Sequence, residues 1–511
     1  MYLQSDEVFE DFISYPPDLR GLEAAIAARR QIPVDRPLLY EVLSKQYREI
    51  GASTERLKPL LTPDTYTVTA AHQPVLAGGP LYTVYKIAAA IHLSTTLTKQ
   101  TGQTVLPVFV IGTEDHDFEE ISRVHLFGKT IQWEAPKPSG PVGRMPIDRL
   151  IPILQNELYP LFGKSSHAPE LRTLFDRAFR PGRSYGRSYQ AFILGLFEGT
   201  GLLVLDMDDA RLKHRFQPIL HKELTGRPTK KLVLQQQEAL YKKFGYAPQI
   251  FVRDVNLFYQ TDHSRLRIDM DGGSWTVTNT DIKWDRTKLQ YLLERHPERF
   301  SPNVALRPVF QEQILPNLAF IGGPSEVAYW MEIKEVFSHF GVHFPVLLRR
   351  PSALWIPPQI QGLLQRYHIF EPPQLFSSLR NWETIVLQQL QPHLLEHSEV
   401  FKHLDKSFEY LHRYAQSEDL HLNNFLEAAQ TRLNQQMEGI LKKIGKQIKQ
   451  KHEVELNRLS KGHALLFPNG KLQERYDNFI PAYLEHGTSY LRALIDNLDP
   501  LQPKFTLLLP D

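Results

Sequence analysis

The sequence has no cysteine among its 511 residues. That absence excludes a thiolate nucleophile, a disulfide framework, an iron–sulfur cluster and a zinc site with cysteine ligands. Any chemistry must therefore depend on histidine, carboxylate, lysine, tyrosine, hydroxyl or backbone groups.

An excess of one charge and long apolar runs are also lacking. The 59 Lys and Arg residues nearly balance the 57 Asp and Glu residues, so the net charge of +2 provides no field that attracts nucleic acid or an anionic membrane. No apolar run approaches the roughly 18–20 residues that span a bilayer. The opening stretch MYLQSDEVFEDF is acidic where a secretory signal needs a basic and then an apolar segment. We therefore expect a cytoplasmic protein with neither a nucleic-acid nor a membrane partner.

A strand, a helix and a second strand are predicted between residues 66 and 113. Tyr66–Ala71 is rich in β-branched residues and ends at a loop rich in Pro and Gly, and Leu81–Lys99 has apolar residues at helical spacing. Val105–Thr113 is almost continuously apolar, as expected for a strand buried on both faces. This succession is typical of a βαβ unit and predicts a parallel sheet.

Later segments extend this pattern and interrupt it. Three further strands of the same sheet are expected at Leu202–Leu205, Ala319–Gly322 and Phe344–Arg349. By contrast, Gln249–Thr278 alternates apolar and polar residues and contains Gly272-Gly273, which is typical of antiparallel hairpins. We therefore predict an α/β fold with a Rossmann-like parallel-sheet core over residues 1–375, which includes N-terminal helices and insertions at about 130–200 and 210–300.

Residues 376–460 differ from this core. Apolar residues recur there every three or four positions, with Lys, Gln and Glu between them, which predicts two long helices that break near Gln416–His421. We expect an antiparallel coiled-coil arm, followed by a tail over 461–511 that returns to the core. The apolar face of such an arm favours a homodimer. The alternative is an arm that packs only on itself or on its own core.

The loop HQPVLAGGP, which follows the first strand, contains the first candidate site residues. It lies at the carboxyl end of a strand, where ligands bind in open α/β sheets. Gly78 and Gly79 allow close approach of the backbone, and the helix N-terminus that follows favours an anion such as phosphate or carboxylate. The polar candidates here are His72, Gln73, Tyr82, Tyr85 and Lys86. The alternative is a Gly-Pro turn selected for packing alone.

A similar pattern occurs in residues 318–334, LAFIGGPSEVAYWMEIK. Again a strand is expected to end at Gly322-Gly323-Pro324, and Tyr329 stands five residues after the Pro, as Tyr85 does in the first turn. Two such turns would direct two helix N-termini into one cleft, where they could hold two anionic groups or both ends of one polar substrate. The remaining candidates of this region are Arg307, Glu326, Trp330 and Arg349. The two arginines suit recognition of carboxylate or phosphate and, equally, structural ion pairs.

An acidic cluster directly follows the strand that ends at Thr113. Glu114, Asp115, His116 and Asp117 could bind a substrate ammonium, hold Mg²⁺ through carboxylate oxygens or supply a general base. Glu119 and Glu120 are interpreted as residues that merely favour a helix N-terminus. The cluster has no ligand spacing of the HExxH type, and we assign no metal site to it. The chain also lacks a GxSxG motif and a P-loop.

Several of these motifs together resemble one family, the bacillithiol biosynthesis cysteine-adding enzymes, over essentially the whole chain and in the same order. They are HQPVLAGGPLYTVYK, TEDHDFEE, LRPVFQE, AFIGGPSEVAYWMEIK and the tail QERYDNFIPAYLEHGTSYLRALID. The resemblance implies a Rossmann-like core with two connecting-peptide insertions and a coiled-coil arm that supports a homodimer. It also implies a ligase that joins the carboxyl group of L-cysteine to the amine of glucosaminyl-malate and so forms bacillithiol.

For such a ligase, each group of candidates has an expected role. Helix N-termini at Gly79 and Gly323, with Lys86 and an arginine, would bind carboxylates or a phosphate. Asp115 or Asp117 would bind and deprotonate the sugar amine. His72 or His116 would assist proton transfer near neutral pH.

The architecture is also similar to class I aminoacyl-tRNA synthetases and nucleotidylyltransferases, in which an HxGH motif binds ATP phosphates at the first turn. Here that stretch is His72-Gln73-Pro74-Val75, and no KMSKS-like loop is found. ATP with Mg²⁺ is a candidate activator of the carboxylate that the sequence does not establish. A nucleotidyl- or aminoacyl-transferring enzyme of this type, and a non-catalytic coiled-coil assembly protein, are the two alternative functions.

Overall fold

The chain forms two compact units. The computed structural model describes residues 9–135, 140–391, 397–502 and 504–509. The first unit comprises Met1–Ala353 and Glu474–Thr506, and the second comprises Leu354–Gln473 and Leu507–Asp511. The chain passes between them three times: within β13 (Ser352–Trp355), between Gln473 and Glu474, and within β14 (Phe505–Leu508). This division differs from the expected boundaries at 375 and 461.

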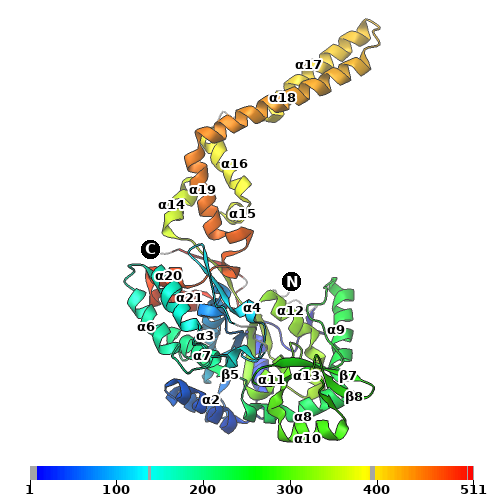
Figure 1. Ribbon diagram of the computed structural model, residues 1–511. Helices are drawn as coiled ribbons and strands as arrows, with labels where there is room; N and C mark the ends of the chain where they lie inside the picture. The colour runs from blue at the N-terminus through cyan, green and yellow to red at the C-terminus, as the bar shows by residue number, and fades with distance from the viewer. Residues whose placement is uncertain (1–8, 136–139, 392–396, 503, 510–511) are drawn as a thin grey trace. The chain divides into compact units, whose positions relative to one another are not determined.

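Five parallel strands form the central sheet of the first unit, in the order β12-β11-β1-β2-β5. They are β1 (Tyr66–His72), β2 (Val105–Ile111), β5 (Leu203–Asp206), β11 (Asn317–Gly322) and β12 (Val346–Arg349). Figure 1 labels β5, which lies at one edge of this sheet. The strands are buried along almost their whole length, which is why their sequences are nearly continuous apolar runs. All five predicted strands of the Rossmann-like core are confirmed.

The direction in which strands are added reverses at β1. β2 and β5 extend the sheet on one side of β1, whereas β11 and β12 extend it on the other. Parallel pairing in register places His72 beside Ile111, and Ala70 beside Ile321. The carboxyl ends of β1, β2 and β11 therefore meet at the switch point, where doubly wound sheets bind ligands.

Helices with clear start and stop signals surround this sheet. α1 (Leu19–Arg29) and α2 (Arg36–Ile50) begin after Asp18 and Asp35, whose carboxylates accept hydrogen bonds from helix amides. α3 (Leu81–Thr101) joins β1 to β2 and ends at Gly102, whose φ of 67° few other residues tolerate. The other α-helices of the unit are α4 (Phe118–Ile121), α5 (Leu150–Ile153), α6 (Ala168–Ala178), α7 (Tyr185–Leu196), α8 (Ala210–Gly226), α9 (Pro228–Phe244), α10 (Arg286–Arg295), α11 (Arg307–Ile314), α12 (Pro324–Glu332), α13 (Lys334–Phe340), α20 (Ile480–His486) and α21 (Thr488–Asn497).

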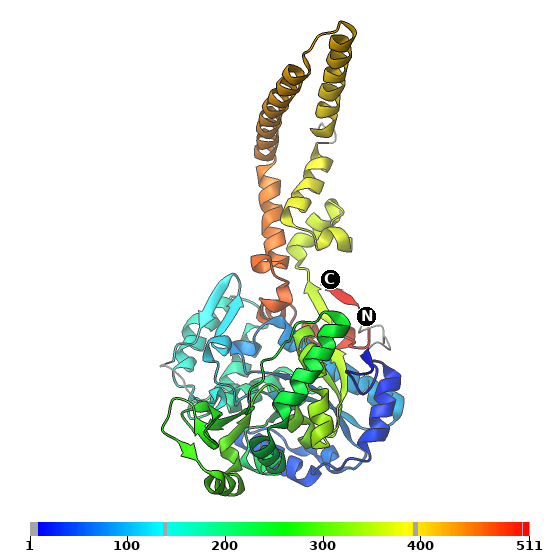
Figure 2. The same cartoon turned by 90° about the vertical axis from the view of Figure 1, so that its right-hand side faces the viewer.

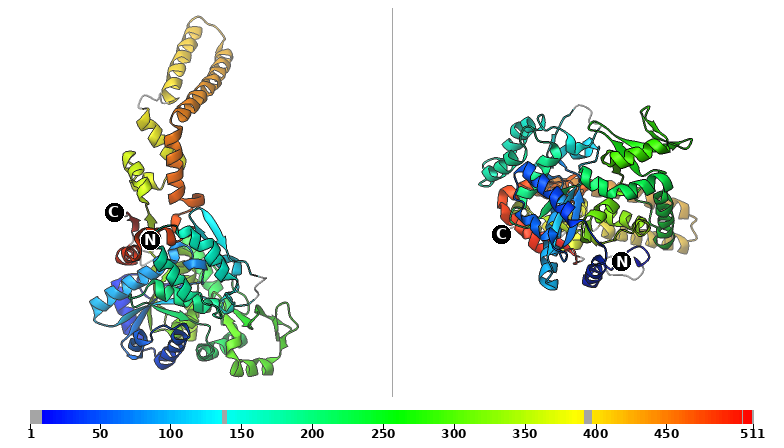
Figure 3. Two further views of the ribbon diagram at one scale, coloured as in Figure 1. Left: turned by 60° about the vertical axis from the view of Figure 1, so that its left-hand side comes forward. Right: turned by 90° about the horizontal axis from the view of Figure 1, so that it is seen from below.

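A second, antiparallel sheet has the strand order β10-β6-β7-β8-β9. Its strands are β6 (Leu257–Gln260), β7 (Arg265–Asp271), β8 (Ser274–Val277), β9 (Lys283–Trp284) and β10 (Phe300–Pro302). Gly272 and Gly273, both at positive φ, form the turn between β7 and β8, which confirms the predicted hairpins. In both views of Figure 3 these green strands lie to one side of the blue strands of the parallel sheet. A short hairpin of β3 (Arg123–Leu126) and β4 (Lys129–Gln132) follows α4.

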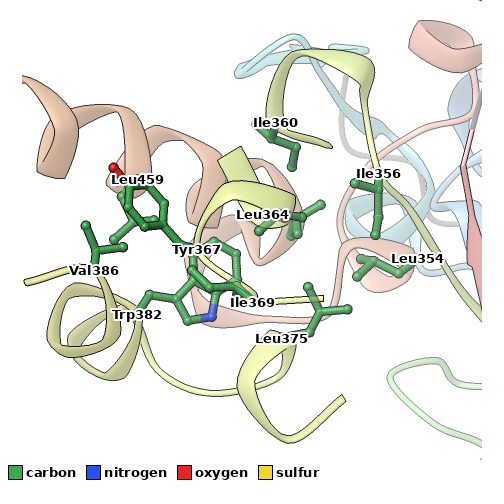
Figure 4. Close-up of a cluster of buried hydrophobic side chains, with 11 residues drawn as sticks. Leu354, Ile356, Ile360, Leu364, Tyr367, Ile369, Leu375, Trp382, Val386 and Leu459 are labelled. Atoms are coloured by element: carbon green, nitrogen blue, oxygen red, sulfur yellow. The ribbon is translucent and has the colours of Figure 1, made fainter. Parts of the chain in front are cut away.

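The second unit is helical and has its own apolar core. Its helices are α14 (Pro358–Arg366), α15 (Pro372–Leu375), α16 (Leu379–Leu390), α17 (His397–Ser417), α18 (Asn423–Lys451) and α19 (Glu453–Leu466). Trp382 of α16 packs in one cluster with Tyr367 and with Leu459 of α19 (Figure 4). Because the cluster begins at Leu354, residues expected at the end of the sheet domain belong to the arm.

α17 and α18 lie side by side as an antiparallel pair (Figure 2). Asp405 accepts a hydrogen bond from Gln430 at 2.8 Å, and His412 lies 3.4 Å from Asn423 nearer the connecting turn. The predicted break near Gln416–His421 is confirmed, because the first helix ends at Ser417 and the second begins at Asn423. Of the helices in the described ranges, none has the length and apolarity needed to cross a bilayer.

Candidate functional site

A cavity of about 790 Å³ lies at the carboxyl ends of the parallel strands. The second sheet contributes part of its wall through Phe258, Arg265 and Arg267. Many of the residues singled out from the sequence line this one cavity: His72, Gln73, Tyr82, Lys86, Glu114, Asp115, His116, Arg307, Gly323, Glu326 and Tyr329. The fold therefore brings the second Gly-Gly-Pro turn, the helix that follows the first turn and the acidic cluster to a common site.

The other candidates lie outside the lining of this cavity: Gly78, Gly79, Tyr85, Asp117, Gly322, Trp330 and Arg349. Tyr85 is fully buried, and Trp330 is stacked on Phe320 with 4.2 Å between ring centroids. Arg349 lines a separate cavity of about 280 Å³, whereas its neighbour Arg350 lines the large one. Burial in the core is a sufficient explanation for Tyr85 and Trp330, and it requires no ligand.

The first Gly-Gly-Pro turn is a packing device. The Asn478 amide donates hydrogen bonds to the carbonyl oxygens of Ala77 and Gly79, at 2.9 and 2.7 Å. The leading amide of α3, at Leu81, donates to the carbonyl oxygen of Asp477 at 2.8 Å. The amide expected to bind an anion is therefore paired within the chain, as the alternative interpretation of this turn requires.

The second turn is closed by its own carboxylate. The amide of Gly323 donates to Oε2 of Glu326 at 2.7 Å, and Glu326 also forms an ion pair with Lys86 of α3. The Lys86 ammonium donates a further hydrogen bond to the carbonyl oxygen of Ala71 at 3.1 Å. Burial would raise the pKa of Glu326, but Lys86 outweighs it and holds that pKa below the ordinary value. The Glu326 carboxylate therefore occupies the helix N-terminus at Gly323, where the sequence predicts a substrate anion.

His72 is neutral at physiological pH. Burial, and then the nearby Lys86 ammonium, lower the pKa of His72 to about 4. Its Nδ1 lies 3.1 Å from the carbonyl oxygen of Gln73. The imidazolium form that proton donation near neutral pH requires is therefore scarcely populated at this position.

Gln73 joins two carboxylates of the acidic cluster. Its amide donates to Oδ2 of Asp115 and to Oε2 of Glu120, each at 2.9 Å. Burial would raise the pKa of Asp115, but Arg265 and the Gln73 hydrogen bond hold it below the ordinary value. For Glu120, burial and then the charge of Asp115 raise the pKa. The two carboxylates thus differ in basicity although one amide holds both.

Asp117 and Glu120 have the opposite places to those expected. Asp117 caps α4, because its carboxylate accepts a hydrogen bond from the amide of Glu120 at 3.1 Å. Glu120 lines the cavity. The sequence predicts the reverse, with Asp117 functional and Glu120 a residue that favours a helix N-terminus. The carboxylates stand so close together in the sequence that their spacing does not show which one caps the helix and which one lines the cavity.

Glu114 belongs to a buried ion-pair network in the wall of the cavity. The Lys213 ammonium lies 2.6 Å from its carboxylate and 2.7 Å from that of Asp208. Arg144 lies 2.7 Å from the same Asp208 carboxylate. These contacts pair Glu114 within the protein and anchor the acidic loop to α8.

Several arginines of the site are not among the candidates predicted from the sequence. Arg253, Arg265, Arg267, Arg350 and Arg475 all line the cavity. Arg350 is held by two hydrogen bonds to the Glu474 carboxylate, at 2.9 and 2.7 Å. Two of these arginines could have been found from the sequence. Arg265 and Arg267 are two positions apart on β7, and residues two apart on a strand lie on the same face.

No group of three His, Asp or Glu side chains in the described part of the chain is arranged to hold a metal ion. Asp115 and Glu120 of the cavity wall share the Gln73 amide, which is a hydrogen-bond donor.

Comparisons with known proteins place both units in one family. Residues 1–351 match the family described as "Bacillithiol biosynthesis BshC, N-terminal Rossmann-like domain", and residues 353–509 match "Bacillithiol biosynthesis BshC, C-terminal coiled-coil domain". A relative from Flavobacterium johnsoniae is 32% identical over 99% of this chain and 96% of its own length. One from Cytophaga hutchinsonii is 30% identical over 98% and 94%. Both are named "Putative cysteine ligase BshC". The resemblance seen in the motifs is confirmed, and the chain belongs to the BshC family of bacillithiol biosynthesis, a family of ligases.

Proposed function

We propose that this protein joins the carboxyl group of L-cysteine to the amine of glucosaminyl-malate in the cytoplasm and so forms bacillithiol. Membership of the family supports the reaction class. The observation that carries the choice of substrate is the presence of both cationic and anionic side chains in one cavity. Cationic side chains, among them Arg253 and Arg267, and the carboxylates Asp115 and Glu120 line the same space.

The arginines suit the two carboxylates of a malate group. Among the described residues, Arg253, Arg267 and Arg307 form no ion pair with a carboxylate of the chain, although each lines the cavity. Guanidinium groups bind carboxylates through paired hydrogen bonds, which fixes the orientation of the substrate. A dicarboxylate is therefore the substrate group that best matches this wall.

Asp115 and Glu120 suit the amine. Asp115, whose pKa is held low, stays ionised and attracts the substrate ammonium. Glu120, whose pKa is raised, is the better acceptor for the proton that the ammonium must lose before it attacks. The neutral amine then forms the amide bond as a carboxyl oxygen of cysteine leaves with its activating group.

The direct test is mass spectrometry of the purified full-length chain with glucosaminyl-malate and L-cysteine, with and without ATP and Mg²⁺. We expect the mass of bacillithiol in at least one of the two conditions. Glu120→Gln should lower its rate of formation by about 100-fold, the usual worth of a general base. Glu119→Gln is the matched control, because Glu119 is exposed and does not line the cavity of about 790 Å³. Absence of product under both conditions would overturn the proposal.

We also propose that the arm pairs with a second copy of this chain. α17 and α18 expose large apolar side chains, with 66% of Tyr410 and 63% of Phe425 accessible to solvent. Single exposed apolar residues are ordinary, but a series along one helical pair is typical of an association surface.

A further inference from the structure

Arg265 is a buried residue of the second sheet that faces the acidic cluster. It is the first residue of β7, and 8% of it is exposed. Its Nε donates to the Ser301 hydroxyl and its Nη2 donates to the carbonyl oxygen of Pro302, each at 3.0 Å. The guanidinium carbon lies 3.9 Å from the centre of the Phe258 ring. These contacts leave the guanidinium little freedom to turn.

The remaining nitrogen of this fixed group faces a histidine of the site. Nη1 of Arg265 lies 3.1 Å from Nδ1 of His116. A guanidinium has donors only and does not lose its proton in proteins, so Nδ1 of His116 must be the acceptor and carry no proton. The ring of His116 is then neutral, and its one proton lies on Nε2.

Asp115 is the group that competes for Nδ1. Its Oδ1 lies 3.6 Å from Nδ1, beyond hydrogen-bond length, and already accepts the backbone amide of His116 at 2.7 Å. Among the charged groups that face the ring, Arg265 and Arg267 disfavour its protonation, whereas Asp115 and Asp117 favour it. Burial and then Arg265 outweigh the carboxylates and hold the pKa of His116 below its ordinary value.

We propose that Arg265 is a positioning residue that holds His116 neutral with its proton on Nε2, so that His116 donates a hydrogen bond to a substrate oxygen and does not act as a base. Nδ1 is occupied and Nε2 already has its proton, so the ring has no site that accepts one. In amide formation, negative charge develops on the carboxyl oxygen of cysteine as the amine adds, and a fixed N–H donor stabilises it. The substrate in this statement rests on the proposed function, whereas the protonation state of His116 does not.

The protonation state is read by ¹⁵N NMR of the full-length chain with labelled histidine and no substrate, and His116→Gln identifies the signal. We expect an unprotonated Nδ1 and a protonated Nε2 at pH 7. Arg265→Met, which keeps an apolar stem over Phe258, should raise the midpoint of the His116 titration by about one pH unit or more. Arg286→Met is the control, because Arg286 is exposed on α10 and lies outside the cavity. A proton on Nδ1 in the unchanged chain, or an unchanged midpoint in Arg265→Met, would overturn the proposal.

Two further variants keep the test decisive if Arg265→Met does not fold. Ser301 does not line the cavity, and Ser301→Ala removes the hydroxyl that accepts from Nε of Arg265. It should raise the midpoint of the His116 titration by a smaller amount than Arg265→Met does. In the ligase assay, His116→Gln retains a donor near the Nε2 position, whereas His116→Asn retains one near Nδ1. We expect at least a tenfold higher kcat for the Gln variant, with similar KM values. Equal kcat values, together with the expected NMR result, would show that the protonation state is right and the substrate role wrong.

Discussion

Lys86 and Glu326 form an ion pair that joins the helices following the two Gly-Gly-Pro turns. The side chain of Lys86 is 2% exposed, and that of Glu326 is 25% exposed on the cavity wall. Because β1 and β11 are neighbours in the sheet, the pair connects the two halves of the doubly wound fold at the switch point.

Removal of one partner should be more damaging than removal of both. Lys86→Met leaves the Glu326 carboxylate without its cation, and we expect the free energy of unfolding to fall by about 3 kcal/mol. In Lys86→Met/Glu326→Gln no unpaired charge remains, so the loss should be smaller. Urea denaturation of the three chains measures both differences. Equal destabilisation by the single and double changes would show that packing of the lysine stem, and not charge, accounts for the effect.

The two turns should respond differently to the same change. Gly79 has φ +70°, and an added Cβ would lie 2.8 Å from Cβ of Val75, so Gly79→Ala should lower stability by about 1–3 kcal/mol. Gly323 has φ −66°, and its added Cβ would meet only Oε2 of Glu326, at 3.4 Å. Gly323→Ala should therefore change stability by less than about 0.5 kcal/mol. Thermal unfolding of the two variants distinguishes the turns, and similar losses would contradict this difference.

Arg267 should affect recognition of the malate group more than turnover. Arg267→Gln removes a cation that has no carboxylate partner in the described residues and lines the cavity. We expect KM for glucosaminyl-malate to rise by about tenfold or more, since a charged hydrogen bond contributes about 1.5–3 kcal/mol. KM for cysteine and kcat should change little. Steady-state kinetics with Arg286→Gln as the control measure this, and a rise in KM for cysteine alone would assign Arg267 to the other substrate.

Glu312 should make the fold less stable as pH rises. It is fully buried in α11, and burial raises its pKa to about 7 from the ordinary value of 4.5. Between these two values the folded chain binds more protons than the unfolded one, so the free energy of unfolding falls as pH rises. The loss amounts to at most about 3 kcal/mol and is complete above about pH 7.

Glu312→Gln should abolish that part of the pH dependence, because an amide does not titrate in this range. The amide oxygen still accepts from Gln311 and Asn317, so the local hydrogen bonds are kept. Urea denaturation at pH 5 and pH 8 measures the difference between the chains. Glu23→Gln is the control, because Glu23 is exposed on α1. A slope as steep in Glu312→Gln as in the unchanged chain would assign it to another group.

The arm should determine the oligomeric state. Phe425→Asp introduces a charge on the exposed apolar surface of α18, and we expect the chain to sediment as a monomer where the unchanged chain sediments as a dimer. Glu427→Lys, an exposed change two residues away, should leave the dimer intact. A monomeric unchanged chain would instead support the alternative of an arm that packs within one molecule.

Local patterns determined the fold class and the place of the site. Strands buried on both faces must be apolar throughout, so the five strands of the sheet were evident in the sequence. The two Gly-Gly-Pro motifs marked the carboxyl ends of β1 and β11, and the acidic cluster marked that of β2. Each of these signals reports backbone conformation or burial over a few consecutive residues.

Tertiary structure decided which residue of the site contacts which, and so which role each one has. Arg265 meets His116 across 149 positions of sequence, and Gln73 meets Glu120 across 47. Gly79 and Gly323 occur in the same motif, yet one has a left-handed conformation against Val75 and the other does not. Sequence by itself determined which chemical groups gather at the ends of the strands. Which group faces which depends on sheet order, register and the placement of an inserted sheet, and those are properties of contacts between distant segments.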